Sequence, residues 1–160
     1  WVSKRLGRGF RVGWIAPGRS KENIIQQKMV HSFSSTSITQ EAIAGFLETG
    51  RYEHHLRGLR RRLKDNVQRY RQAIEQYFPE GTKISRPDGG FLLWVELENK
   101  INTVDLLELS LKRNISIAPG RMFSLQGQFQ NCLRLSYGQQ WNDNIDRKLK
   151  VLGNLAKLLL

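Results

Sequence analysis

Lys4 and Arg11 are the residues near the start of the chain whose types and spacing could do chemistry. They lie seven positions apart, with Gly7, Gly9 and Gly13 around them. A desolvated lysine amine forms a Schiff base with an aldehyde, and an arginine binds a phosphate through two parallel hydrogen bonds. Glycines let the backbone approach a ligand closely. The segment predicts a site for an aldehyde that bears a phosphate; the alternative is a pair of solvated surface residues at a turn.

Cysteine and histidine offer no second site of this kind. Cys132 is the single cysteine, so it cannot form an internal disulfide, and we expect it to pack as a small buried hydrophobe in a reducing cytoplasm. His31, His54 and His55 have no metal-ligand spacing, since adjacent histidines on a helix point in different directions. We predict no metal site.

The composition is that of a globular protein with a strong positive charge. The 160 residues are 39% hydrophobic and 25% charged, and the formal net charge is +12. Such a charge favours polyanions as partners, although acidic residues elsewhere in a longer protein could compensate it. Apolar runs such as "FLLWV" are far shorter than the roughly 20 residues of a membrane span, and the first residues of the chain contain neither the apolar region nor the cleavage site of a secretion signal. We expect a cytoplasmic protein that makes no contact with a membrane.

Three elements are expected in the first fifty residues. Residues 9–15 alternate and are rich in β-forming types, which predicts a strand. Residues 20–31 start with serine and an acidic residue, as a helix does. A second helix begins at Ser37, which has capping-box spacing to Gln40, and ends at Gly50. We interpret residues 1–50 as a remnant of a larger α/β domain.

Residues 51–78 predict one long helix. An apolar stripe recurs at steps of three and four residues, at Leu56, Leu59, Leu63, Val67, Tyr70, Ile74 and Tyr77. Basic side chains occupy the other faces, at Arg57, Arg60, Arg61, Lys64 and Arg71. A basic helix can enter a groove of DNA, which would make the chain a nucleic-acid-binding module. We favour the alternative, in which the stripe is buried and the charged faces meet solvent.

The rest of the chain predicts short strands and two further helices. Strands are expected within 82–86, 90–97, 115–119 and 132–137. One helix is expected over 103–114 with Thr103 as its cap, and another from near Trp141 with an apolar side. The predicted fold class is α+β, a small and mostly antiparallel sheet covered by helices, and we expect residues 51–160 to form a self-contained domain.

The pattern "SK-x-L-x-x-G-x-R-V-G-W" at the start of the chain closely resembles fold-type-I pyridoxal phosphate enzymes, the class I/II aminotransferases. The resemblance implies that Lys4 carries the cofactor, that Arg11 grips its phosphate and that Ser3 lies beside the lysine. It also implies that the chain is the back part of a longer protein, with the long helix between the domains and residues 51–160 as the C-terminal small domain. Because the family's other cofactor-binding segments precede the lysine, we expect this chain to be inactive alone.

Three later segments resemble the same family in the same order. They are "RPDGGFLLWVEL" at 86–97, "ISIAPGRMF" at 115–123 and "NCLRLSYG" at 131–138. The last resembles the segment whose arginine binds the substrate's α-carboxylate, which implies that Arg134 is the carboxylate clamp. An arginine among apolar neighbours in a strand is costly to bury without an anion, which agrees with this role. The alternative is an arginine at a strand edge that faces water.

Within this family the chain is most similar to the MocR group of GntR-type bacterial transcription regulators. The stretch "FLETGRYEHHLRGLRRRLKDNVQRYRQAI" and the segments around "ISIAPGRMFS" and "CLRLSYGQQW" carry that similarity. It implies a DNA-binding domain upstream of this chain, an amino-acid-like effector, pyridoxal 5'-phosphate as cofactor, and a homodimer at full length. The alternative is a free-standing aminotransferase that acts on an amino acid and a 2-oxo acid.

Overall fold

The computed structural model describes residues 6–32, 34 and 36–160. Ser3 and Lys4 therefore lie outside the described residues. The chain forms two compact units, of which the first ends at Leu59 and the second runs from Arg60 to Leu160.

Short helices lie in the described part of the first unit, ahead of a long helix that begins at Arg51. They are η2 (Arg8–Phe10), η3 (Gly18–Ser20), α1 (Lys21–His31) and α2 (Ser37–Glu48). The two predicted α-helices are confirmed, but the strand expected over residues 9–15 is wrong, because a 3-10 turn and irregular backbone occupy this stretch. A strand needs a hydrogen-bonded neighbour, and no other strand lies among the described residues of this unit.

The start of α2 differs from the predicted capping box. The cap residue is Thr36 rather than Ser37, and no side chain caps the helix through a hydrogen bond. The hydroxyl of Thr39 instead donates to the carbonyl of Thr36 at 2.8 Å. The end of the helix is as expected, since Gly50 follows it with a φ of 68°, a backbone conformation that glycine adopts without strain.

The long helix α3 runs from Arg51 to Tyr77, as its apolar stripe predicts. The division between the two units falls inside this helix. The boundary expected from the sequence lies just before it, and the assignment of residues 1–50 to a larger domain stays a prediction. In the second unit, α3 buries Tyr70, Ala73 and Ile74 in the core, while its basic side chains are mostly exposed.

The second unit is built on a four-stranded antiparallel sheet, so the predicted α+β class is confirmed. The strands are β1 (Lys83–Ile84), β2 (Leu92–Glu96), β3 (Ala118–Pro119) and β4 (Cys132–Ser136), in the order β1-β2-β4-β3. The central pair β2–β4 places Leu93 opposite Leu135 and Trp94 opposite Arg134. Successive side chains of a strand point to opposite faces, so the leucines lie on one face and Trp94 and Arg134 on the other.

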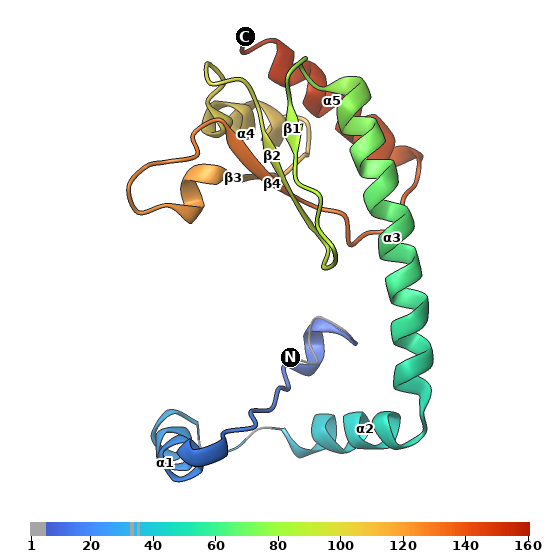
Figure 1. The fold of residues 1–160 in the computed structure, drawn as a ribbon, viewed down its shortest axis with the longest axis vertical. Helices are drawn as coiled ribbons and strands as arrows, with labels where there is room; N and C mark the ends of the chain where they lie inside the picture. The colour runs from blue at the N-terminus through green and yellow to red at the C-terminus, as the bar shows by residue number, and fades with distance from the viewer. Residues whose placement is uncertain (1–5, 33, 35) are drawn as a thin grey trace. The chain divides into compact units, whose positions relative to one another are not determined.

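Helices cover the leucine face of the sheet. α3 and α5 (Asp143–Lys157) lie against it, on the side away from the loop that follows β3 (Figure 1). α4 (Thr103–Leu111) joins the same core through Leu106. Leu93 and Leu133 at the centre of the sheet are fully buried. The result is one continuous apolar core on one side of the sheet.

Asn102, rather than Thr103, caps α4: its side chain accepts a hydrogen bond from the backbone N–H of Val104 at 2.9 Å. The Thr103 hydroxyl is buried, and it lies 2.9 Å from the carbonyl of Gln130 and 2.7 Å from that of Cys132. The threonine therefore ties the start of α4 to the start of β4.

Two residues hold α3 and α5 in place. The buried side chain of Asn66 donates to the carbonyls of Tyr137 at 3.0 Å and Gln139 at 2.6 Å, and it accepts from the backbone N–H of Trp141 at 3.3 Å. Gly153 of α5 lies so close to α3 that a Cβ there would collide with the carbonyl of Tyr77. α3 is thus joined to the β4–α5 connection and packed directly on α5.

Candidate functional site

Arg134 lies at the centre of β4, with Trp94 of β2 on one side and Ala118 of β3 on the other. Its neighbours Leu133 and Leu135 are buried, whereas Arg134 itself is exposed. The alternation of a strand explains the difference, because it turns the arginine to the face opposite the core. The sequence-based argument that its apolar neighbours would bury it therefore does not hold within the described chain. The guanidinium is accessible to a ligand from the open face of the sheet.

Aromatic rings surround this guanidinium. Its central carbon lies 4.5 Å from the centre of the Phe123 ring, a distance typical of a cation–π contact. The Trp94 ring meets Phe123 edge to face at 5.7 Å and Phe129 at 5.6 Å. Phe123 and Phe129 are 42% and 45% exposed, so these rings form a partly open aromatic wall beside the positive charge. Together they can receive an anion that carries an apolar group.

Sequence reasoning missed this aromatic wall. The sequence patterns place Trp94 only in a strand and Phe123 only in a family loop. No local signal identifies Phe129, because its contact with Trp94 spans distant parts of the chain. Only the pairing of β2 with β4 and the return of the loop bring the rings together.

The loop between β3 and β4 is held closely against its own ends. Phe129 has a φ of 62°, a left-handed conformation that is strained for a bulky residue. Its carbonyl accepts from the N–H of Cys132 at 3.0 Å, and a Cβ at Gly120 would collide with the same oxygen. The glycine of the Pro119–Gly120 pair is therefore required by a close approach to the backbone of Phe129.

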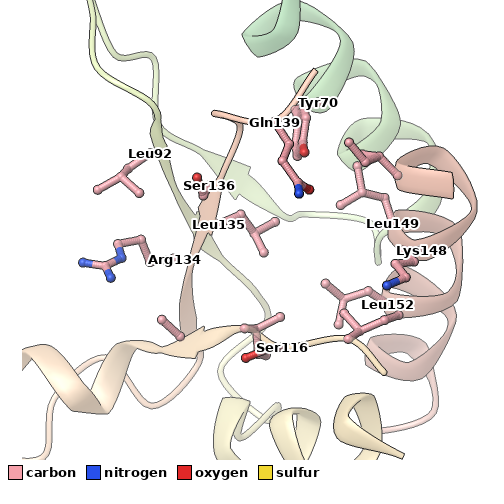
Figure 2. Close-up of a pocket in the computed structure, with 14 residues that line it drawn as sticks. Tyr70, Leu92, Ser116, Arg134, Leu135, Ser136, Gln139, Lys148, Leu149 and Leu152 are labelled. Carbon is pink, nitrogen blue, oxygen red and sulfur yellow. The ribbon is translucent and has the colours of Figure 1, made fainter. Parts of the chain in front are cut away.

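A cavity of about 410 Å³ opens at the sheet edge beside Arg134. Figure 2 shows Leu92 and Arg134 on one side of β4, with Leu149 and Leu152 of α5 on the other. Polar groups also line it, at Ser116, Ser136, Gln139 and Lys148. The Lys148 ammonium donates to the carbonyl of Asn114 at 3.1 Å. Sequence reasoning did not identify these four residues as part of a site.

The other predicted site residues belong to the first unit. Ser3 and Lys4 lie outside the described residues. Arg11 has a φ of 48° directly after the η2 turn, and its side chain is exposed. Within the described part of the chain it forms no ion pair, so its donors are available to an anion. Arg11 and Arg134 lie in different units.

The thiol of Cys132 is buried, as expected from its apolar neighbours. Burial raises its pKa, and the negative charge of Glu96 raises it further. At neutral pH the thiol is therefore protonated and a poor nucleophile. The described residues contain no group of three or more histidine, cysteine, aspartate or glutamate side chains that could hold a metal ion. None of the described helices has the length and apolar composition of a membrane span.

Comparison with known proteins places these features in a family. The family model "Aminotransferase class I and II" matches residues 2–152. The chain is 38% identical over 155 residues to the uncharacterized HTH-type transcriptional regulator YdcR of Escherichia coli K12, covering 97% of this chain and 33% of that protein. It is 28% identical over 159 residues to the 2-aminoadipate transaminase of Thermus thermophilus, covering 99% of this chain and 40% of the enzyme. The chain thus spans a third to two fifths of these relatives.

A solved structure shows the same fold. The α-aminoadipate aminotransferase LysN of Thermus thermophilus, complexed with N-(5'-phosphopyridoxyl)-L-leucine, superposes with a TM-score of 0.90 at 27% identity. The match covers 98% of this chain and 40% of the LysN chain. The described helices and sheet therefore have counterparts in one part of a larger aminotransferase.

Proposed function

Because the chain belongs to the aminotransferase class I and II family, we propose that it is the C-terminal, effector- and cofactor-binding part of a bacterial transcription regulator of the GntR/MocR type. The observation that carries this proposal is the similarity to HTH-type regulators, which reaches 38% identity and extends over 97% of the chain. The chain covers only 33% of that regulator. In the proposed protein, a DNA-binding domain lies in the part that this chain does not cover.

Pyridoxal 5'-phosphate is the proposed cofactor. When bound, it supplies an electron sink for charge that develops at the α-carbon of an amino acid. Arg11 fits its phosphate, because the guanidinium is exposed and forms no ion pair among the described residues. Lys4 is proposed as the residue that bonds the cofactor aldehyde, with Ser3 beside it, as the family pattern implies. In an enzyme the Lys4 amine would also move the proton of the substrate's α-carbon.

Arg134 is the proposed carboxylate clamp for an amino-acid-like effector. Its planar fork can donate two parallel hydrogen bonds to a carboxylate. It is exposed on the open face of the sheet, and Phe123 restricts the guanidinium from one side. This arrangement orients a ligand through its carboxylate and leaves the ligand's side chain near Trp94 and Phe129.

In a regulator, ligand binding would act through a conformational equilibrium. A ligand shifts such an equilibrium only by its difference in affinity for the two states. We infer that a ligand held by Arg134 in the small domain, and by the cofactor in the larger domain, favours one arrangement of the two domains and thereby changes DNA affinity. We also propose that the full-length protein is a homodimer, as the similarity to the MocR group implies, and that it is cytoplasmic.

A free-standing aminotransferase is the second candidate. The 2-aminoadipate transaminase match covers 99% of the chain, and LysN superposes with a TM-score of 0.90. Both candidates use the same cofactor site and the same carboxylate clamp. They differ in the protein upstream of this chain, where only the regulator has a helix-turn-helix domain.

Two measurements on the full-length protein test the proposal. Sequencing the gene upstream should reveal a helix-turn-helix domain, and a large aminotransferase domain alone would favour the enzyme instead. After incubation with the cofactor and reduction with borohydride, peptide mapping should find the modification on Lys4. Modification of another lysine would contradict the assigned cofactor site without deciding between regulator and enzyme.

A further inference from the structure

The positive charge of the second unit is concentrated in one stretch of α3. Residues 60–71 contain six cations and one carboxylate, whereas residues 72–160 contain eleven cations and nine carboxylates. The remainder of the unit is thus nearly balanced. The charge on α3 is a local feature of the molecule, and the proposed effector site does not account for it.

Five of these cations are exposed and form what we term the α3 basic surface: Arg60, Arg61, Arg62, Lys64 and Arg69. None of the five forms a salt bridge within the described part of the chain. Arg71 differs, because its side chain is only 21% exposed and lies 3.7 Å from Glu75. The basic surface therefore presents charges that nothing described in the chain neutralises.

The geometry of the helix spreads these charges over its solvent side. At 100° per residue, Arg60 and Lys64 lie on one flank, Arg62 and Arg69 lie on the other, and Arg61 lies between them. At 1.5 Å per residue, the stretch from Arg60 to Arg69 is about 14 Å long. A duplex of that length carries about eight phosphates.

A hollow lies on the second flank. It has a volume of about 180 Å³, and Arg62 and Arg69 line it together with Asp65, Asn66, Gln140 and Trp141. The amide nitrogen of Asn66 already donates to two carbonyls and is not available to a ligand. The positively charged donors in the hollow are the guanidinium groups of Arg62 and Arg69. Asp65 opposes them with a single negative charge, so the hollow keeps a net positive charge.

Every exposed residue between 60 and 72 is charged or an amide: Arg60, Arg61, Arg62, Lys64, Asp65, Gln68, Arg69 and Gln72. Interfaces between proteins usually contain an apolar centre with aromatic residues. Interfaces with DNA are more polar and much more positively charged. The composition of the α3 basic surface therefore favours a nucleic acid over an acidic protein.

We propose that the α3 basic surface binds the phosphate backbone of double-stranded DNA, as a contact additional to that of the helix-turn-helix domain. This inference rests on the proposed function, since a transcription regulator has DNA as its binding partner. Contacts of this kind are independent of sequence and position the duplex without reading its bases. In the regulator these contacts would lengthen the stretch of DNA that the protein binds, because the duplex would also lie along the effector-binding part of the molecule.

Salt dependence tests the proposal directly. Binding of the full-length protein to a duplex of about 60 base pairs and unrelated sequence would be followed by fluorescence anisotropy over a series of salt concentrations. The slope of log K against log salt is negative, and each lost phosphate contact reduces its magnitude by about 0.9. We expect the double variant R61Q/K64Q to reduce the magnitude of the slope by about 1.8 and to weaken DNA binding at least about tenfold at low salt, and we expect R62Q/R69Q to have the same effect.

The matched control is R113Q/K157Q, which removes one arginine and one lysine that are exposed elsewhere in the second unit. Its slope should equal that of the unchanged protein. If both α3 variants also keep that slope while DNA binding persists, the α3 basic surface is not a DNA contact, and an acidic protein or solvent faces it. If the unchanged full-length protein binds no duplex at all, the proposed regulator function fails together with this inference.

Discussion

The guanidinium of Arg134 lies over the ring of Phe123, with 4.5 Å between its central carbon and the ring centre. The two residues come from different segments, β4 and the η4 turn (Gly120–Phe123). The ring restricts the guanidinium on one side, and Arg134 forms no salt bridge among the described residues, so its hydrogen-bond donors remain available for a carboxylate. The contact therefore orients the proposed carboxylate clamp without occupying it.

Replacement of the clamp itself should have the largest effect on ligand binding. We expect Arg134→Ala in the full-length protein to weaken binding of amino-acid-like carboxylates by about 2 to 5 kcal/mol, because the ligand buries the charge pair. Arg134→Lys should recover only part of the loss, since an ammonium lacks the planar fork. Isothermal titration calorimetry measures both. Equal carboxylate affinities of the Arg134→Ala variant and the unchanged protein would show that Arg134 does not bind the ligand.

The ring beneath the clamp should matter less. An exposed cation–π contact contributes about 0.5 to 1 kcal/mol, so Phe123→Leu should weaken carboxylate binding about two- to fivefold. Phe123→Tyr keeps the ring and should bind like the unchanged protein. A merely structural role would instead lower the unfolding midpoint of Phe123→Leu and leave the affinity of the folded protein unchanged.

Substitution of Asn66 should destabilise the second unit. Its side chain makes two donated bonds and one accepted bond to the β4–α5 connection. Asn66→Ala would remove these three hydrogen bonds, of which the one to the Tyr137 carbonyl is buried, and we expect it to lower the free energy of unfolding by about 2 to 4 kcal/mol. Urea denaturation followed by circular dichroism measures this. Gln68→Ala, at an exposed position of the same helix, is the control and should change stability by less than about 0.5 kcal/mol.

Gly153 and Gly58 should respond oppositely to the same substitution. Gly153→Ala places a Cβ against the Tyr77 carbonyl, and we expect a loss of about 1 to 3 kcal/mol because backbone must shift. Gly58, in α3, has nothing within 4 Å of such a Cβ. Gly58→Ala should therefore gain up to about 1 kcal/mol from helix propensity. Thermal unfolding of both variants compares them, and equal effects would contradict the close packing of α3 on α5.

Alkaline pH should destabilise the second unit. Burial raises the pKa of the phenols of Tyr70, Tyr77 and Tyr137, and a hydrogen bond to Asp146 raises that of Tyr77 further. A phenol whose pKa in the folded state exceeds its unfolded value of about 10 stabilises the fold fully at pH values below about 10. This stabilisation is lost as the pH rises through the folded-state pKa. Unfolding measured at increasing pH should show this decline beginning near about pH 10, and Tyr77→Phe should reduce it.

The helices were predictable because their periodicity is a property of the local sequence. The stripe from Leu56 to Tyr77 gives the length and buried face of α3. The four strand positions were also identified, although β1 and β3 are only two residues long. Local patterns could not give the strand pairing, because the hydrogen-bonded neighbours are distant in the chain. The failed strand over residues 9–15 has the same cause, since alternation alone does not supply a partner.

The candidate site was predictable only as single residues. Arg134 is identifiable from its segment, but its exposure depends on which face of β4 it occupies. Phe129 adopts a left-handed backbone that no sequence rule assigns to phenylalanine. Thr103 has the residue type of a cap but instead serves as a buried tie to β4. The tertiary structure decides whether such a side chain caps a helix or forms hydrogen bonds to a distant strand.

Both outer strands of the sheet are only two residues long, with Lys83 in β1 and Pro119 in β3. A lysine discourages an incoming chain from pairing with a sheet margin, and a proline has no N–H to offer it. Sheet margins that are short and carry such residues are a poor template for the intermolecular pairing that leads to aggregation. The second unit is thereby suited to remain dispersed at high protein concentrations.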